Sequence, residues 1–191
     1  MTRGRILEAA EHLFSDQGFA NTSVEEIGQA AGGFSKGAVY SNFDNKTELL
    51  VAVFEAQYLR LTATLDEALG QVTEPGEQTA VVVAWYGEHF RNNPWPDSLP
   101  DLFAVARTDA TARRRLRDHF RLIESTVTAM VKSEQARLGI RYELAPATIA
   151  ALAVSIVAGL AITGLLEPER DNSELFAGAL GVLLQSSPAA R

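Results

Sequence analysis

The sequence contains no cysteine among its 191 residues. This absence excludes disulfide bonds, thiol catalysis and zinc sites with thiolate ligands. The chain also lacks an excess of positive charge, because 17 lysine and arginine residues stand against 24 acidic ones, for a formal net charge of −7. Residues 1–50 hold four basic and seven acidic side chains. Composition therefore argues against a nucleic-acid binder held by bulk charge, and any DNA binding must come from individually placed groups.

The usual sequence signatures of enzymes and of secretion are missing as well. Charges at Glu8 and Glu11 interrupt the N-terminal apolar residues, so we expect no signal peptide. The three histidines show no metal-ligand spacing, and no Gly-x-Ser-x-Gly elbow occurs. The Gly32–Gly37 spacing of a phosphate-binding loop is not followed by its Lys-Ser/Thr pair. We therefore expect no enzymatic activity, no metal and no cofactor.

Apolar residues recur at three- and four-residue steps along most of the chain, which predicts helices. A first helix is expected over about residues 2–17, and Ser23 with Glu26 matches a capping box that opens a second. Gly32 and Gly33 end this second helix, and Ser35 can cap a third. A long fourth helix precedes the break at residues 74–76. We predict an all-α fold of about nine helices, with no strand and no internal repeat.

Residues 23–43 carry the most informative pattern, two short helices joined by a glycine-containing turn. This arrangement is a helix-turn-helix. The polar side of the second helix offers hydroxyls, an amide and one cation, which are groups that hydrogen-bond phosphates and base edges. From the pattern alone, a plain helical hairpin without DNA binding remains an alternative.

Residues 3–54 resemble the N-terminal domain of the TetR family of transcriptional repressors. The resemblance is carried by IGQAAG at residues 27–32, FSKGAVYSNF at residues 34–43 and NKTELL at residues 45–50. One departure is that the family normally has a single glycine where this chain has Gly32 and Gly33. Glycine tolerates positive φ, so the turn either absorbs the extra residue as a bulge or re-aims the recognition helix.

The resemblance implies a helix-turn-helix DNA-binding domain at residues 1–48 and a helical ligand-binding and dimerisation domain at residues 49–191. It implies a cytoplasmic, homodimeric regulator, by family expectation a repressor, that binds a palindromic operator and is released by a small, largely apolar effector. A helical ligand-binding protein or a helical-bundle enzyme without DNA binding is the alternative. The residues it assigns to double-stranded operator DNA are Thr22, Ser35, Lys36, Gly37, Ala38, Tyr40, Ser41 and Lys46.

Residues 144–166 contain no charge and are long enough to cross a bilayer. Three interpretations are open: a membrane span, a buried core helix and a subunit interface. Alanine dominates the segment and contributes little transfer energy, and small residues recur at every fourth position, which lets another helix approach closely. We expect an interface and no membrane, because the resemblance places dimerisation on the last two helices. The predicted interface residues are Ala151, Ser155, Gly159, Thr163, Phe176, Leu180 and Leu183.

Aromatic residues gather in the middle of the chain, beside a proline-rich stretch. For any single one of them, an ordinary place in the core is the simpler interpretation. As a group they suit an apolar effector cavity, with His89 or Arg107 as a polar contact. The predicted ligand-binding residues are Trp85, Tyr86, His89, Phe103, Arg107, Phe120, Ile123 and Val127.

Overall fold

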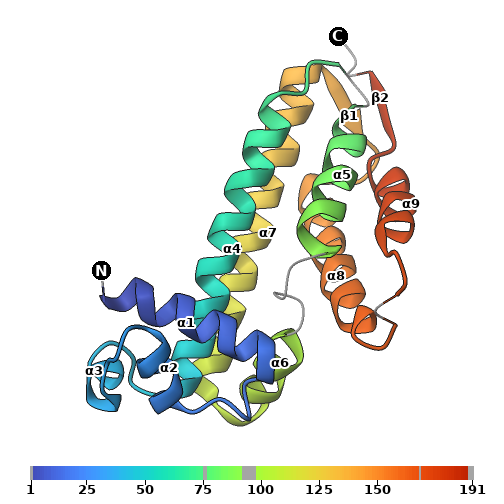
Figure 1. Cartoon of the computed structure of the whole chain (residues 1–191). Coiled ribbons are helices and arrows are strands. Elements are labelled where there is room, and N and C mark those ends of the chain that lie inside the picture. Colours follow the sequence, from blue (N-terminus) through green and yellow to red (C-terminus); the bar gives the residue numbers. More distant parts are fainter. Residues whose placement is uncertain (1, 75–76, 92–97, 168, 189–191) are drawn as a thin grey trace. The chain divides into compact units, whose positions relative to one another are not determined.

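The structure of the chain is a computed structural model that describes residues 2–74, 77–91, 98–167 and 169–188, with the backbone alone for residues 90–91 and 186–188. These residues form nine α-helices and two short strands, so the expected all-α class is confirmed (Figure 1). The chain divides into two compact units. Unit 1 comprises residues 1–60 and 97–118, and unit 2 comprises residues 61–96 and 119–191. These units describe packing within one chain, and the functional boundary after residue 48 stays a prediction.

Unit 1 contains the helix-turn-helix. Its elements are α1 (Thr2–Gln17), α2 (Val24–Ala30), α3 (Lys36–Tyr40) and α6 (Leu99–Thr108), together with the first parts of α4 (Lys46–Gly70) and α7 (Ala110–Leu138). Its interior is aliphatic and aromatic, and burying each such side chain contributes roughly 1.5–3 kcal/mol. The largest fully buried side chains of this unit are Ile6, Ile27, Val39, Phe43, Leu49, Leu50, Val51, Phe54, Leu99 and Leu102.

An ion pair connects the two long helices inside unit 1. Arg115 on α7 donates to the Glu55 carboxylate on α4 at 2.8 Å and lies 3.4 Å from the Glu48 carboxylate. All three side chains are about one-third exposed. The sequence gives no signal for this contact, because spacing along one helix says nothing about the charges of a neighbouring helix.

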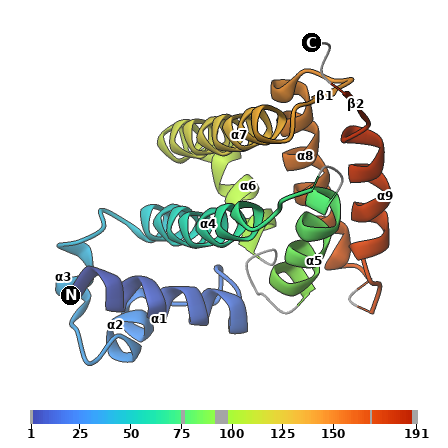
Figure 2. The ribbon, with the colours of Figure 1, turned by 90° about the horizontal axis from the view of Figure 1, so that it is seen from above.

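Unit 2 contains α5 (Glu77–Arg91), α8 (Pro146–Gly164) and α9 (Ser173–Leu183), with the remaining parts of α4 and α7. Both views show α5, α8 and α9 side by side (Figures 1 and 2). Tyr86 on α5 stacks on Phe176 of α9 with 4.1 Å between ring centroids, and Leu180 completes this buried cluster. Ile156, Val157 and Leu160 of α8 pack against it. The contacts fix the arrangement of the three helices.

Two three-residue strands, β1 (Ile140–Tyr142) and β2 (Ser186–Pro188), pair antiparallel in unit 2. The prediction that the chain has no strand was therefore wrong for these residues, although the fold class is unchanged. Three residues are too few to show the alternation by which a strand is recognised. Gly139, with φ of +63°, follows the end of α7 and turns the chain into β1.

The 19-residue helix α8 has the length and apolar composition of a membrane span, with a mean hydropathy of 2.1. Only 17% of that apolar window is buried within the single chain. By this measure, most residues of α8 lie outside the buried core of the single chain. An apolar helix with open faces needs a further partner.

Candidate DNA interface

The helix-turn-helix is built from helix ends that the local sequence specifies. The capping box is complete: the Ser23 hydroxyl accepts from the Glu26 amide at 3.2 Å, and the Glu26 carboxylate accepts from the Ser23 amide at 2.7 Å. Ser35 caps α3 by accepting from the Ala38 amide at 3.2 Å. Asn45 caps α4 by accepting from the Glu48 amide at 2.7 Å. These bonds satisfy amides that a helix start leaves without partners, so they fix where each helix begins.

Both glycines of the unusual turn adopt positive φ, +115° at Gly32 and +79° at Gly33. Their amides donate to the Gln29 carbonyl, and the Phe34 amide donates to the Gly28 carbonyl at 2.8 Å. In the common glycine-ended turn the closing bond joins residues five apart, whereas here it joins residues six apart. The extra residue is therefore enclosed within the turn that ends α2.

Gly28 and Gly32 have neighbouring atoms where a side chain would begin. A Cβ at Gly28 would lie 2.3 Å from the Phe34 carbonyl oxygen, which is closer than any side chain permits. At Gly32 a Cβ would lie 1.8 Å from the Arg5 guanidinium, which also sits over the Phe34 ring at 5.3 Å. Gly33 has open space around it. Close approach to backbone thus requires glycine at Gly28. At Gly32, where the flexible Arg5 side chain can move, and at Gly33, it is the positive φ that favours glycine.

Helix α3 presents a polar surface outward and anchors itself by Val39, which is buried. Lys36, Gly37, Tyr40 and Ser41 are exposed. The Ser41 hydroxyl donates to the Ala38 carbonyl at 2.8 Å, which leaves its oxygen able to accept a further hydrogen bond. The predicted recognition residues are therefore accessible on one short, capped helix.

The Lys36 ammonium is held in place in the free chain. It lies 2.6 Å from the carboxylate of Glu25 on α2 and 5.9 Å from the centre of the Tyr40 ring. The hydrogen bond to Lys36 lowers the pKa of Glu25, and the same bond raises the pKa of Lys36. Glu25 was not predicted as a site residue, since a helix-to-helix pair leaves no mark in the spacing of the sequence.

Two of the predicted DNA-binding residues, Thr22 and Lys46, point inward in this structure. The Thr22 hydroxyl is buried and donates to the Gly18 and Leu13 carbonyls, at 2.8 and 3.2 Å. The Lys46 ammonium donates to the Phe19 carbonyl and lies 4.3 Å from the centre of the Phe19 ring. Burial lowers the pKa of Lys46. Both side chains tie the ends of neighbouring helices together in the chain without DNA.

The small residues of α8 lie on the surface of unit 2. Ser155, Gly159 and Thr163 are exposed, and a Cβ at Gly159 would meet nothing within 4 Å. The Ser155 hydroxyl donates to the Ala151 carbonyl at 2.8 Å, and the Thr163 hydroxyl donates to the Gly159 carbonyl at 2.9 Å. Each hydroxyl proton is thus satisfied within its own helix, which lowers the cost of covering this surface.

The structure corrects the interface prediction for α9. Phe176, Leu180 and Leu183 are at most 6% exposed and form part of the interior of unit 2, so their side chains are not available to a second subunit. The exposed apolar residues of α9 are Leu175 and Val182. A helix with apolar residues on two faces offers no sequence signal for which face turns inward.

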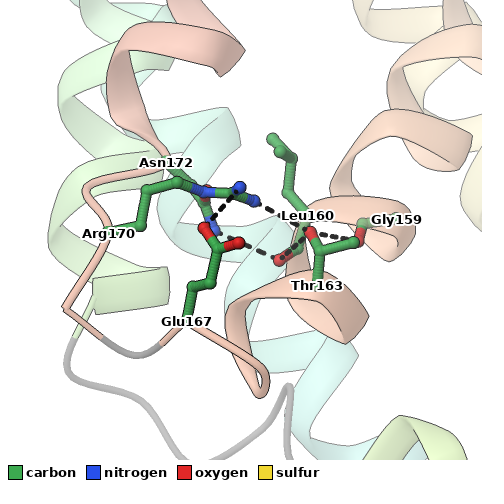
Figure 3. Close-up of polar contacts among 6 residues, drawn as sticks. All are labelled: Gly159, Leu160, Thr163, Glu167, Arg170 and Asn172. Atoms are coloured by element: carbon green, nitrogen blue, oxygen red, sulfur yellow. Dashed lines mark hydrogen bonds and ion pairs between the residues drawn. The ribbon is translucent and has the colours of Figure 1, made fainter.

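A polar cluster holds the turn between α8 and α9 (Figure 3). Arg170 donates to the Glu167 carboxylate at 2.8 Å, to the Asn172 side-chain oxygen at 2.8 Å and to the Thr163 hydroxyl at 3.3 Å. The Asn172 amide group in turn donates to the Leu160 carbonyl at 3.2 Å. That carbonyl lies four residues before the end of α8. The cluster therefore connects the C-terminal part of α8 to the segment that leads into α9.

The family model described as "Bacterial regulatory proteins, tetR family" matches residues 6–53, which include the whole helix-turn-helix. The transcriptional regulator TtgR of Pseudomonas putida is 42% identical over 55 residues, which make up 29% of this chain and 26% of TtgR. The chain thus aligns with about a quarter of that relative.

Solved structures extend the similarity to the rest of the fold. A TetR-family transcriptional regulator from Rhodococcus sp. superimposes with a TM-score of 0.78 at 20% identity, covering 96% of this chain and 98% of that one. SmeT, the repressor of a multidrug efflux pump in Stenotrophomonas maltophilia, superimposes with a TM-score of 0.66 at 26% identity, covering 95% and 87%.

The DNA-binding domain of this chain belongs to the TetR family of helix-turn-helix transcriptional regulators. The recognition made from the sequence is confirmed, and the TetR family is a family of transcriptional regulators and not of enzymes. Among the described residues, no group of three or more metal-ligating side chains occurs.

The predicted effector residues are divided between the two units. Phe103 and Arg107 belong to unit 1 and are exposed, and the other six belong to unit 2. Of these six, Tyr86 and Ile123 are buried, whereas Trp85 and His89 are half-buried and stack at 5.2 Å between ring centroids. The Trp85 indole donates to the Thr64 hydroxyl at 2.9 Å. Burial raises the pKa of Tyr86 to about 12, so this phenol stays neutral at physiological pH.

Proposed function

We propose that this protein is a cytoplasmic repressor that binds a palindromic operator as a homodimer and leaves it when a small, largely apolar effector binds. The observation that carries the proposal is the exposed face of α3, where Lys36, Tyr40 and Ser41 are presented by a capped helix of a TetR-type domain. Two such helices, related by a two-fold axis, read half-sites about 34 Å apart in successive major grooves. SmeT, which is similar over most of its length, is itself a repressor.

The proposed dimer uses exposed small and apolar residues at helical spacing on α8 and α9. On α8, Leu152, Ser155, Gly159 and Ile162 recur at steps of three and four. On α9, Leu175 and Val182 are two turns apart, at 53% and 64% exposure. A narrow apolar seam of this period is the pattern that packs against another helix. A second copy of the same pair of helices supplies that partner and covers the apolar surface of α8.

The proposed effector binds in the C-terminal domain. Trp85, His89, Phe120, Ile123 and Val127 remain the candidate lining within unit 2, with Tyr86 behind them in the core. Half-buried aromatic rings beside one imidazole suit a ligand that is mostly apolar and carries one polar group. SmeT has been solved as a complex with triclosan, a small molecule, which supports this class of effector. Release of DNA requires that the effector favour the non-binding shape, since equal affinity for both shapes shifts nothing.

Operator binding by surface variants tests the proposal. A selection from a random duplex library with the wild-type protein first identifies the operator. Lys36→Ala is then expected to weaken binding to that duplex roughly ten- to hundredfold, because a charge-assisted contact to base edges is lost. Tyr40→Phe should weaken it less, since only one hydroxyl is removed. Asp16→Asn, an exposed change in the same unit, serves as the control.

Lys46→Ala separates a phosphate contact from a structural role. If Lys46 leaves Phe19 and binds a phosphate, the variant weakens operator and scrambled duplexes alike and lowers the dependence on salt by about one counterion. If Lys46 stays on the Phe19 carbonyl, thermal stability falls and the salt dependence is unchanged. A wild-type protein that selects no duplex, or Lys36 and Tyr40 variants that bind as the wild type does, would contradict the proposed DNA interface.

A further inference from the structure

The four basic side chains of residues 1–50 all contact other residues of the proposed DNA-binding domain. Arg3 lies over the Phe43 ring at 4.8 Å, Arg5 covers the glycine turn, and Lys46 is bonded to Phe19. Lys36 differs in that its partner is a carboxylate, Glu25, at 2.6 Å. Since the same residues carry more acid than base, little free positive charge remains to attract phosphate without regard to sequence.

The Glu25–Lys36 pair lies on the recognition surface itself. Lys36 is the first residue of α3, and Glu25 is the second residue of α2, so the pair bridges the two helices of the motif. Both side chains are about half exposed, at 56% and 52%. The ammonium is also within reach of the Tyr40 ring, which limits the directions it can take. The pair therefore belongs to the DNA-facing surface and not to the interior of the domain.

We infer that Glu25 is a specificity-determining positioning residue, which holds Lys36 for base contacts and keeps its charge from serving phosphates at random. This inference rests on the proposed function. An ammonium already neutralised by a carboxylate adds little to sequence-independent attraction, which depends on released counterions. The Lys36 ammonium leaves or shares the Glu25 carboxylate only when another acceptor lies beside the position in which the ion pair holds the ammonium. The carboxylate thus lowers binding to wrong sequences more than binding to the operator, which is how a repulsive group produces specificity.

The test is a salt titration of Glu25→Gln on the operator selected by the wild type and on a scrambled duplex of equal length. Glutamine keeps the size of the side chain and removes its charge. We expect binding to the scrambled duplex to become about three- to tenfold tighter, with a salt dependence steeper by about one counterion. Binding to the operator should change less, so the ratio of the two affinities falls. Asp16→Asn, which changes the net charge equally, should leave that ratio as in the wild type.

A double variant separates the ion pair from charge alone. With Lys36→Met in place there is no ammonium to position, so adding Glu25→Gln should strengthen both duplexes equally and leave the ratio unchanged. Thermal unfolding of each variant shows that the domain is folded. A Glu25→Gln ratio equal to that of Asp16→Asn, or the same fall in ratio when Lys36 is absent, overturns the inference while operator binding by the wild type stands. A wild type that selects no operator overturns the proposed function, and the inference falls with it.

Discussion

The helix-turn-helix and the α8–α9 pair show two different ways in which a sequence specifies structure. In the first, each helix end is set by a residue a few positions away: Ser23, Ser35 and Asn45 each accept a hydrogen bond from a nearby amide. In the second, the exposed side of α8 has no partner among the residues that the structure describes. The DNA-binding region is thus defined by local bonds, whereas the proposed second chain accounts for the exposed surface of α8.

Gly159→Leu tests the proposed role of the α8 surface and should have the largest effect, which is on dimerisation. The position is open in the single chain, so the variant should fold with nearly unchanged stability. In a dimer the added side chain occurs twice across a two-fold axis, and overpacking costs about 1–3 kcal/mol at each site. We expect a loss of about 2–6 kcal/mol in dimerisation free energy, measured by light scattering over a range of concentrations.

Gly70→Leu is the matched control, because Gly70 is also a helical glycine with open space around it. It should leave the oligomeric state unchanged. A Gly159→Leu protein that remains as dimeric as the wild type would contradict the interface. A Gly159→Leu protein that fails to fold would favour the interpretation of α8 as a core helix.

Gly28→Ala and Gly33→Ala together test how tightly local bonds define the turn. At Gly28 the new methyl group would press on the backbone of Phe34, so the free energy of unfolding should fall by about 1–3 kcal/mol. At Gly33 there is space, and only the positive φ opposes alanine, with a cost of roughly 1 kcal/mol. Urea unfolding measures both. Equal losses at the two positions would show that close approach to Phe34 is not what holds the turn.

Much of unit 1 could be predicted from the sequence, because its determinants are neighbours in the chain. The capping box, the glycines at positive φ and the buried Val39 and Phe43 all follow from short-range spacing. The inward positions of Thr22 and Lys46 could not, since their partners are backbone carbonyls brought near by folding. The Glu25–Lys36 pair was missed for the same reason, as it joins two helices whose relative placement no spacing reveals.

The interior of unit 2 was harder to predict, because α9 is apolar on more than one face. The structure turns Phe176 toward Tyr86 and leaves Val182 exposed. Both residues fit an inward or an outward position by their chemistry alone. Only the packing of α5, α8 and α9 against one another selects between them.

Tyr86 provides a measurement that sharpens the description of this interior. Its folded-state pKa of about 12 lies above the ordinary value of 10, mainly because of burial. The neutral phenol therefore contributes its full stabilisation below about pH 10, and this contribution is lost as the pH rises toward and through 12. Relative to Tyr86→Phe, the wild type should lose about 2 kcal/mol of unfolding free energy between pH 9 and pH 11.5.

Urea unfolding of both proteins at the two pH values gives this difference directly. Other buried tyrosines, such as Tyr142, are the same in both proteins and cancel. Identical losses in the two proteins would mean that Tyr86 is accessible to water in solution. That outcome would also weaken the assignment of Phe176 to the core.

Deletion of Gly33 should have the smallest effect, and it decides whether the unusual turn is a bulge or a change of aim. With Gly33 removed, the Phe34 amide would meet the Gly28 carbonyl across five residues, as in the common glycine-ended turn. The Ser35 cap and the buried Val39 would still fix the start and the inner face of α3. We therefore expect a change in unfolding free energy below about 1 kcal/mol, and the same consensus from operator selection. A different consensus from a stably folded variant would show that the second glycine re-aims the recognition helix, so that one inserted residue, enclosed by a local hydrogen bond, selects the operator.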